Sequence, residues 1–63
     1  MKASWRDSTE QLPKDDRLVI GCFLRGEYRI CYFDGDDWYD TDTDNVIKEP
    51  LFWMYIPEVP FVL

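Results

Sequence analysis

Two runs of β-branched, aliphatic and aromatic residues, 17–24 (RLVIGCFL) and 27–33 (EYRICYF), are separated only by Arg25-Gly26. Such residues favour strands, and glycine adopts the positive φ of a tight turn without steric cost. The sequence therefore predicts two antiparallel strands joined as a hairpin. A two-residue turn pairs Leu24 with Glu27, Cys22 with Arg29, Ile20 with Cys31 and Leu18 with Phe33.

Further strand signals follow the hairpin. Asp34-Gly35 marks a second turn, and residues 37–40 (DWYD) predict a third short strand. Residues 51–56 (LFWMYI) lie between Pro50 and Pro57 and predict a final strand at an edge of the sheet, because proline cannot donate to a β ladder. The expected fold class is mainly β, an antiparallel meander of three to four strands; a small α+β domain is the alternative.

The chain has the length of one small domain, spanning residues 1–63. We expect an irregular N-terminal arm over 1–16, the β meander over 17–56 and an extended, proline-rich tail over 57–63. Trp5 and Leu12 are the isolated hydrophobic residues expected to fasten the arm over the core. Three Trp, four Tyr and four Phe supply the large apolar side chains that so short a chain needs.

The formal net charge is −6, from thirteen acidic and seven basic residues. This charge repels phosphate backbones and anionic bilayers, so the sequence predicts neither direct nucleic-acid binding nor membrane binding, and it suits a basic partner. Solubility alone also explains moderate acidity. Two cysteines are too few for a disulfide scaffold, and we find neither a signal-like start nor an apolar run of about 20 residues. A cytoplasmic location is expected.

The residues needed for common catalytic mechanisms are missing from the sequence. There is no histidine, Cys22 and Cys31 form no C-x-x-C pair, and the three glycines are isolated. These absences exclude histidine-dependent nucleophilic sites, standard zinc spacings and glycine-rich phosphate loops. The chain is predicted not to be an enzyme and to need no cofactor, and its thiols are expected to behave as small buried hydrophobes.

An acidic segment over 34–44 contains Asp40-x-Asp42-x-Asp44, the spacing that opens a calcium-binding loop. The rest of that motif is missing, since the sixth position is Asn45 instead of glycine and the twelfth is Leu51 instead of glutamate. Asp40, Asp42 and Asp44 are therefore weak candidates for a divalent-cation site. A solvated turn rich in Asp is the alternative.

Aromatic and apolar residues near the C-terminus suggest a contact surface. The interaction candidates are Trp38, Tyr55, Phe61, Val62 and Leu63. The last three form an apolar stretch that either docks on a partner or a second copy, or folds back on its own core. Trp53 is expected in the core.

The order of landmarks resembles a known family. Trp5, Leu12-Pro13, Asp37-Trp38-Tyr39 and Trp53-Met54 followed by Pro57-Glu58 and Pro60 are similar to the family named domain of unknown function 551, small proteins of bacteria and bacteriophages. The resemblance covers about residues 5–60. Members often carry histidine before the Trp-Met pair and proline after it; Phe52 and Tyr55 stand there in this chain, which makes it a divergent member.

These observations favour a non-catalytic protein-interaction module, which the resemblance would place in a bacterium or phage. It would act on an unknown protein partner or by self-association, through a sheet edge or the apolar tail. An acidic decoy or inhibitor of a basic nucleic-acid-binding host protein is the alternative. A weak divalent-cation site in the acidic turn is a further alternative.

Overall fold

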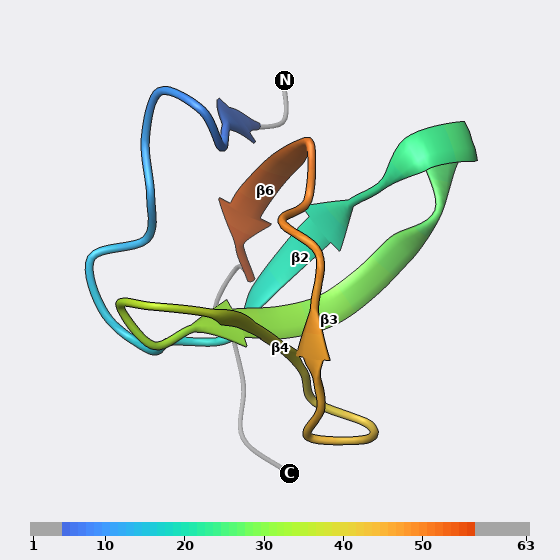
Figure 1. Ribbon diagram of the computed structural model, residues 1–63. Coiled ribbons are helices and arrows are strands. Elements are labelled where there is room, and N and C mark those ends of the chain that lie inside the picture. Colours follow the sequence, from blue (N-terminus) through green and yellow to red (C-terminus); the bar gives the residue numbers. More distant parts are fainter. Residues whose placement is uncertain (1–4, 57–63) are drawn as a thin grey trace, which may run out of the picture.

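The computed structural model describes residues 5–56, and within them it forms one open antiparallel sheet of six strands (Figure 1). The strands are β1 (Arg6–Asp7), β2 (Val19–Cys22), β3 (Tyr28–Phe33), β4 (Trp38–Asp40), β5 (Val46–Ile47) and β6 (Phe52–Tyr55), and a tight turn, η1 (Leu24–Gly26), joins β2 to β3. Their order across the sheet is β1-β6-β2-β3-β4-β5. The mainly β, antiparallel class is confirmed. β2 to β5 form a meander, whereas β6 crosses over to pair with β2 and has β1 on its other side.

The β2–β3 hairpin has the predicted turn but a different register. Arg25 and Gly26 both have positive φ, 67° and 73°, and the Glu27 amide donates to the Leu24 carbonyl at 3.5 Å. The Phe23 amide also donates to Glu27, at 2.7 Å, so two residues of one strand oppose one of the other, as in a β-bulge. Consequently Val19 pairs with Cys31 and Ile20 with Ile30. The predicted pairing of Ile20 with Cys31 is wrong by one residue.

That one-residue shift decides which side chains enter the core, because successive residues of a strand point to opposite faces. The core consists of Val19, Cys31, Trp38 and Trp53, with Phe33, Ile47 and Tyr55 packed against it. All seven lie on one face of the sheet, which we call the core face. Trp53 is fully buried, as predicted for a core residue.

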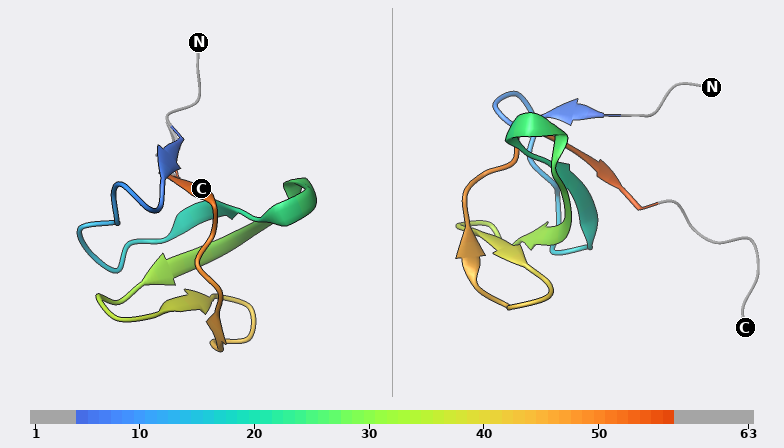
Figure 2. Two further views of the ribbon diagram at one scale, coloured as in Figure 1. Left: turned by 45° about the horizontal axis from the view of Figure 1, so that its top comes forward. Right: turned by 90° about the vertical axis from the view of Figure 1, so that its right-hand side faces the viewer.

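The segment between β5 and β6 crosses in front of β2 and β3 and covers part of the core face (Figures 1 and 2). Pro50 in this segment is fully buried. A Cβ placed on Gly21 of β2 would lie 3.2 Å from the Pro50 Cβ and 2.9 Å from the Cys31 Sγ. Gly21 therefore lets the crossing segment approach the sheet closely.

The final strand is not at an edge. β6 lies between β1 and β2, with Arg6 opposite Trp53 on one side and Gly21 opposite it on the other. The prediction of an edge position is wrong because the flanking prolines lie outside the four paired residues, and the arm supplies a further strand. The Ser8 amide extends this contact by donating to the Leu51 carbonyl at 3.2 Å.

The described part of the arm is held mainly by polar contacts. The Trp53 Nε1 donates to the Gln11 carbonyl at 2.9 Å, and the Lys14 amide donates to the Tyr55 hydroxyl at 3.3 Å. Pro13 is buried, whereas Leu12 is 43% exposed. The buried Pro13 therefore anchors the arm, a role that the sequence had assigned to Leu12.

Helices long and apolar enough to cross a membrane are not found within residues 5–56. The predicted extended tail, 57–63, lies outside the described residues.

Candidate interaction surface

The face of the sheet opposite the core, which we call the outer face, is apolar and open. Its strand positions are Asp7, Ile20, Cys22, Tyr28, Ile30, Tyr32, Tyr39, Val46, Phe52 and Met54. Nine of these ten residues are aliphatic, aromatic or sulfur-containing, and none is Lys or Arg. Among the described residues, no segment covers this face as Pro50 covers the other.

The exposed aromatic residues cluster at one end of the outer face. Cys22 pairs with Tyr28 on one side and with Phe52 on the other, so these side chains form a row across β3, β2 and β6. Tyr28 is 63% exposed and Phe52 is 43% exposed. Trp5 stacks on Tyr28 with ring centroids 6.0 Å apart, and Ile30, 40% exposed, borders the row. A contiguous apolar patch of this kind marks an interaction site more often than scattered single residues do.

Carboxylates border the other end of the outer face. Tyr32 and Tyr39 stack with centroids 5.1 Å apart. The Tyr32 hydroxyl donates to the Asp44 Oδ1 at 2.8 Å, and this bond raises the pKa of Tyr32 to about 12. Asp34 likewise raises the pKa of Tyr39. With Asp7 on β1, the outer face has an acidic border, so it is electrostatically complementary to a basic partner.

Two aspartates of the acidic segment, Asp34 and Asp40, close turns with their side chains. The Asp34 Oδ1 accepts from the amides of Asp36 and Asp37, both at 2.8 Å, and these bonds lower the pKa of Asp34. The Asp40 Oδ1 accepts from the Asp42 amide at 2.9 Å in the same way. Such Asx turns explain why Asp recurs here.

Two of the three candidate metal ligands, Asp40 and Asp44, are engaged with different partners. The Asp40 Oδ2 pairs with Arg29 at 2.8 Å, and the Asp44 Oδ1 accepts from Tyr32. Within residues 5–56, no group of three or more His, Cys, Asp or Glu side chains is placed to hold a metal ion. The cation hypothesis gains no support from this geometry.

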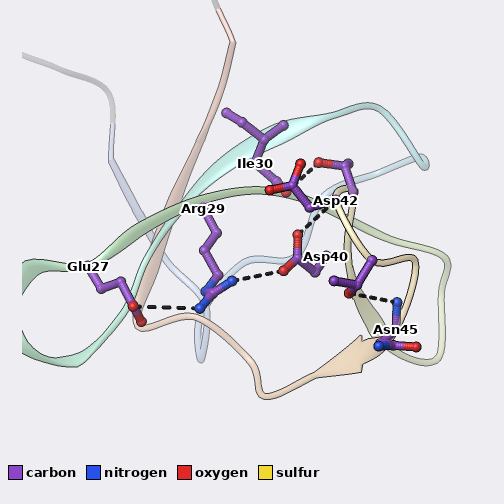
Figure 3. Close-up of polar contacts among 8 residues, drawn as sticks. Glu27, Arg29, Ile30, Asp40, Asp42 and Asn45 are labelled. Atoms are coloured by element: carbon purple, nitrogen blue, oxygen red, sulfur yellow. Dashed lines mark hydrogen bonds and ion pairs between the residues drawn. The ribbon is translucent and has the colours of Figure 1, made fainter.

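An open hollow of about 430 Å³ lies beside the first half of β3. It is lined by Glu27, Tyr28, Arg29, Ile30, Asp40, Thr41 and Asp42. Figure 3 shows Arg29 between Glu27 and Asp40, and the Arg29 Nη2 lies 3.6 Å from the Glu27 Oε2. The Asp40 side chain is only 8% exposed, so its ion pair with Arg29 is partly desolvated. We call this feature the β3 hollow.

The sequence-predicted interaction residues have different environments. Trp38 is buried at 4% exposure and packs against Phe33, and its Nε1 has no hydrogen-bond partner among the described residues. Tyr55 is half-buried, with its ring 5.0 Å from that of Trp53. Phe61, Val62 and Leu63 lie outside the described residues.

Sequence reasoning missed Trp5, Tyr28, Ile30 and Phe52 as surface residues. Tyr28 and Phe52 belong to the predicted strands, and the alternation of a strand does place them on one face. The bulge at Phe23 shifts the β2 residue that Tyr28 pairs with, and the pairing of Phe52 with Cys22 joins distant parts of the chain, so no local pattern identified that face.

No family model, curated protein or solved structure matches the chain. A functional proposal therefore starts from the surface described above.

The two free cysteines occupy opposite faces of the sheet, Cys31 on the core face and Cys22 on the outer face. Burial, with a smaller contribution from Asp40, raises the pKa of Cys31 to about 11 from an ordinary 9.0. In the unfolded chain the thiol ionises near pH 9. Its contribution to stability is therefore complete below pH 9 and is lost as the pH rises toward 11.

We accordingly expect the free energy of unfolding to fall between pH 9 and pH 11, as measured by urea denaturation. Cys31→Ala should reduce this fall, and Cys22→Ala, the matched control, should keep it. Equal pH dependence in wild type and Cys31→Ala would contradict the assignment.

Proposed function

We propose that this chain is a non-catalytic protein-interaction module, of bacterial or phage origin and cytoplasmic, that docks a protein partner through its outer face. The observation that supports the proposal best is the row of exposed Tyr28 and Phe52 with half-buried Cys22 between them, and with Trp5 stacked on Tyr28. Aromatic side chains are enriched among the residues that dominate binding energy. Within residues 5–56, the outer face also has no second layer of the kind that normally covers an apolar sheet face.

The charge of the chain favours a partner with particular chemistry. The outer face has no basic strand residue, and its border carries Asp7, Asp34 and Asp44. Two copies of a chain with a net charge of −6 repel each other, so self-association is disfavoured. The occupant that fits is a segment of another protein with apolar side chains flanked by Lys or Arg. The proposed membership of the domain of unknown function 551 family is compatible with this role and adds no partner.

The test uses a fluorescent 14-residue peptide of Leu and Lys, a Leu/Glu counterpart and a Ser/Lys counterpart. We expect the Leu/Lys peptide alone to bind, as followed by fluorescence anisotropy. Replacing both Tyr28 and Phe52 with serine should weaken binding about tenfold or more, because each removes an exposed aromatic contact. The control is Leu24→Ser, which removes a 74% exposed apolar side chain from the η1 turn. It should change Kd less than about twofold.

Salt separates the proposal from the acidic-decoy alternative. Apolar docking should largely persist at 0.5 M NaCl, whereas contacts between exposed charges are screened at that ionic strength. Equal binding of the Ser/Lys and Leu/Lys peptides, abolished by salt, would favour the decoy and contradict docking on the outer face.

A further inference from the structure

β4 pairs with only the second half of β3, so the first half of β3 has an unpaired edge on that side. β3 has six residues, but β4 pairs only with Cys31, Tyr32 and Phe33. Beyond Asp40 the chain turns away, because the Asp40 Oδ1 accepts from the Asp42 amide at 2.9 Å and the Asp40 carbonyl accepts from the Asp44 amide at 2.7 Å. Within residues 5–56, no strand pairs with Tyr28–Ile30 on this side.

The backbone groups at this edge point into the β3 hollow. In an antiparallel sheet, successive residues direct their N–H and C=O groups to opposite neighbours. The Phe23–Glu27 bond assigns Glu27 and Arg29 to the β2 side, so Tyr28 and Ile30 face the other way. The Ile30 carbonyl accepts from the Thr41 amide at 3.2 Å and from the Thr41 Oγ1 at 2.9 Å. No described loop or turn supplies a backbone partner for the Tyr28 N–H, the Tyr28 C=O or the Ile30 N–H.

The hollow beside this edge has room and charge for a ligand. Its volume is about 430 Å³. Tyr28 and Ile30, whose side chains point to the outer face, form one border of the hollow. The hollow is also lined by Glu27, Asp40 and Asp42, whose three carboxylates outnumber the single guanidinium of Arg29 (Figure 3). Arg29 is already paired with Asp40 and Glu27, so the charge left for a ligand is negative.

We infer that Tyr28–Ile30 binds an extended segment of the partner as an added antiparallel strand. In a hydrogen-bonded antiparallel pair, opposing side chains share a face. Because Thr41 already occupies the Ile30 carbonyl, the added strand ends beside Ile30. The residue opposite Tyr28 then meets the apolar outer face, and the residues on either side of it meet the carboxylates of the hollow. The segment recognised therefore alternates apolar and basic residues. This inference rests on the proposed function and specifies its mode of recognition, which is strand addition with alternate side-chain specificity.

The probe is the hexapeptide Ac-Lys-Val-Lys-Val-Lys-Val-NH2, followed by ¹H–¹⁵N NMR of the full chain. In the free protein, the amides of Tyr28 and Ile30 should exchange with solvent faster than those of Arg29 and Cys31, which face β2. Adding the peptide should shift the Tyr28 and Ile30 amide signals and slow their exchange. The counterpart with Glu in place of Lys should not bind.

Methylated peptides test the backbone contact directly. In the added strand, the valine N–H groups face β3 and the lysine N–H groups face solvent. Methylating the valine amides should abolish binding, whereas methylating the lysine amides should leave Kd within about threefold. Equal binding of the two methylated peptides would overturn strand addition.

Two matched variants, Asp42→Lys and Asp36→Lys, test how much charge contributes to binding of the hexapeptide. Asp42 and Asp36 are both exposed, and each donates its backbone amide to the aspartate two residues earlier. Asp42 lines the hollow, and Asp36 does not. Asp42→Lys should weaken hexapeptide binding about threefold to tenfold, and Asp36→Lys less than about twofold. Equal effects would overturn the assignment of the basic side chains to the hollow.

The inference and the proposed function fail in distinguishable ways. If the hexapeptide shifts signals of Trp5 and Phe52 but leaves the Tyr28 and Ile30 amides unchanged, the outer face binds and strand addition is overturned. If neither this hexapeptide nor the Leu/Lys peptide binds, both are overturned.

Discussion

Trp53→Ala is expected to leave the chain unfolded at 25 °C. Trp53 is fully buried at the centre of the core and is paired on both sides, with Arg6 and with Gly21. Truncating a buried Trp to Ala costs about 3–5 kcal/mol. The single core of a domain shorter than about 70–80 residues rarely supplies more than about 3–5 kcal/mol, and this chain has 63 residues, so the loss removes most or all of its stability.

The measurement is the ¹H–¹⁵N spectrum of Trp53→Ala, which should collapse to the narrow dispersion of an unfolded chain. Trp53→Phe is the control, because it keeps an aromatic ring and loses the 2.9 Å bond to the Gln11 carbonyl. It should fold, with a loss of about 1–3 kcal/mol. A well-dispersed spectrum for Trp53→Ala, with unchanged stability, would show that the core does not depend on this residue.

Gly21→Ala is expected to destabilise the fold by about 1–3 kcal/mol, because the added methyl group over-packs the core. The new Cβ would lie 2.9 Å from the Cys31 Sγ, 3.1 Å from the Phe23 Cε1 and 3.2 Å from the Pro50 Cβ. Cys31 and Pro50 are both fully buried, so neither has open space to move into. Urea denaturation measures the loss.

A double-mutant cycle with Cys31→Ala tests the cause. Removing the sulfur leaves room for the new methyl group, so the double variant should be more stable than the sum of the single effects predicts. Gly26→Ala is the contrasting control, since its Cβ meets nothing within 4 Å while its φ of 73° is unfavourable for alanine. Its cost, about 1 kcal/mol, should be independent of Cys31. Strict additivity of Gly21→Ala and Cys31→Ala would argue against the steric explanation.

Local signals in the sequence predicted the strands better than their arrangement. β-branched and aromatic runs predict β2, β3 and β6 because strand propensity and turn residues act over a few positions. The bulge at Phe23, which sets the hairpin register, has no such signal: Gly26 marks the turn but not the extra residue before it. The pairing of Arg6 with Trp53 joins residues 47 positions apart, and no local pattern specifies it.

The candidate site was predictable only in its chemistry. The net charge and the aromatic content indicated a basic partner and aromatic contacts, as the outer face now suggests. Composition does not distinguish a buried Trp38 from a half-exposed Trp5, because the two differ in the face of the sheet they occupy. The open edge of β3 was not predictable, since it depends on how early the Asp40 turn ends β4.

The pairing of β1 with β6 also has a consequence for synthesis of the protein. The core cannot close until Trp53 has left the ribosome, because Trp53 fills its centre and β6 joins the arm to the rest of the sheet. Until then the nascent chain presents the apolar β2–β3 hairpin without its neighbour β6. Folding that depends on such distant contacts is slow relative to local hairpin formation. The chain therefore reaches its native state after translation of nearly all of the described residues, as one late, cooperative step.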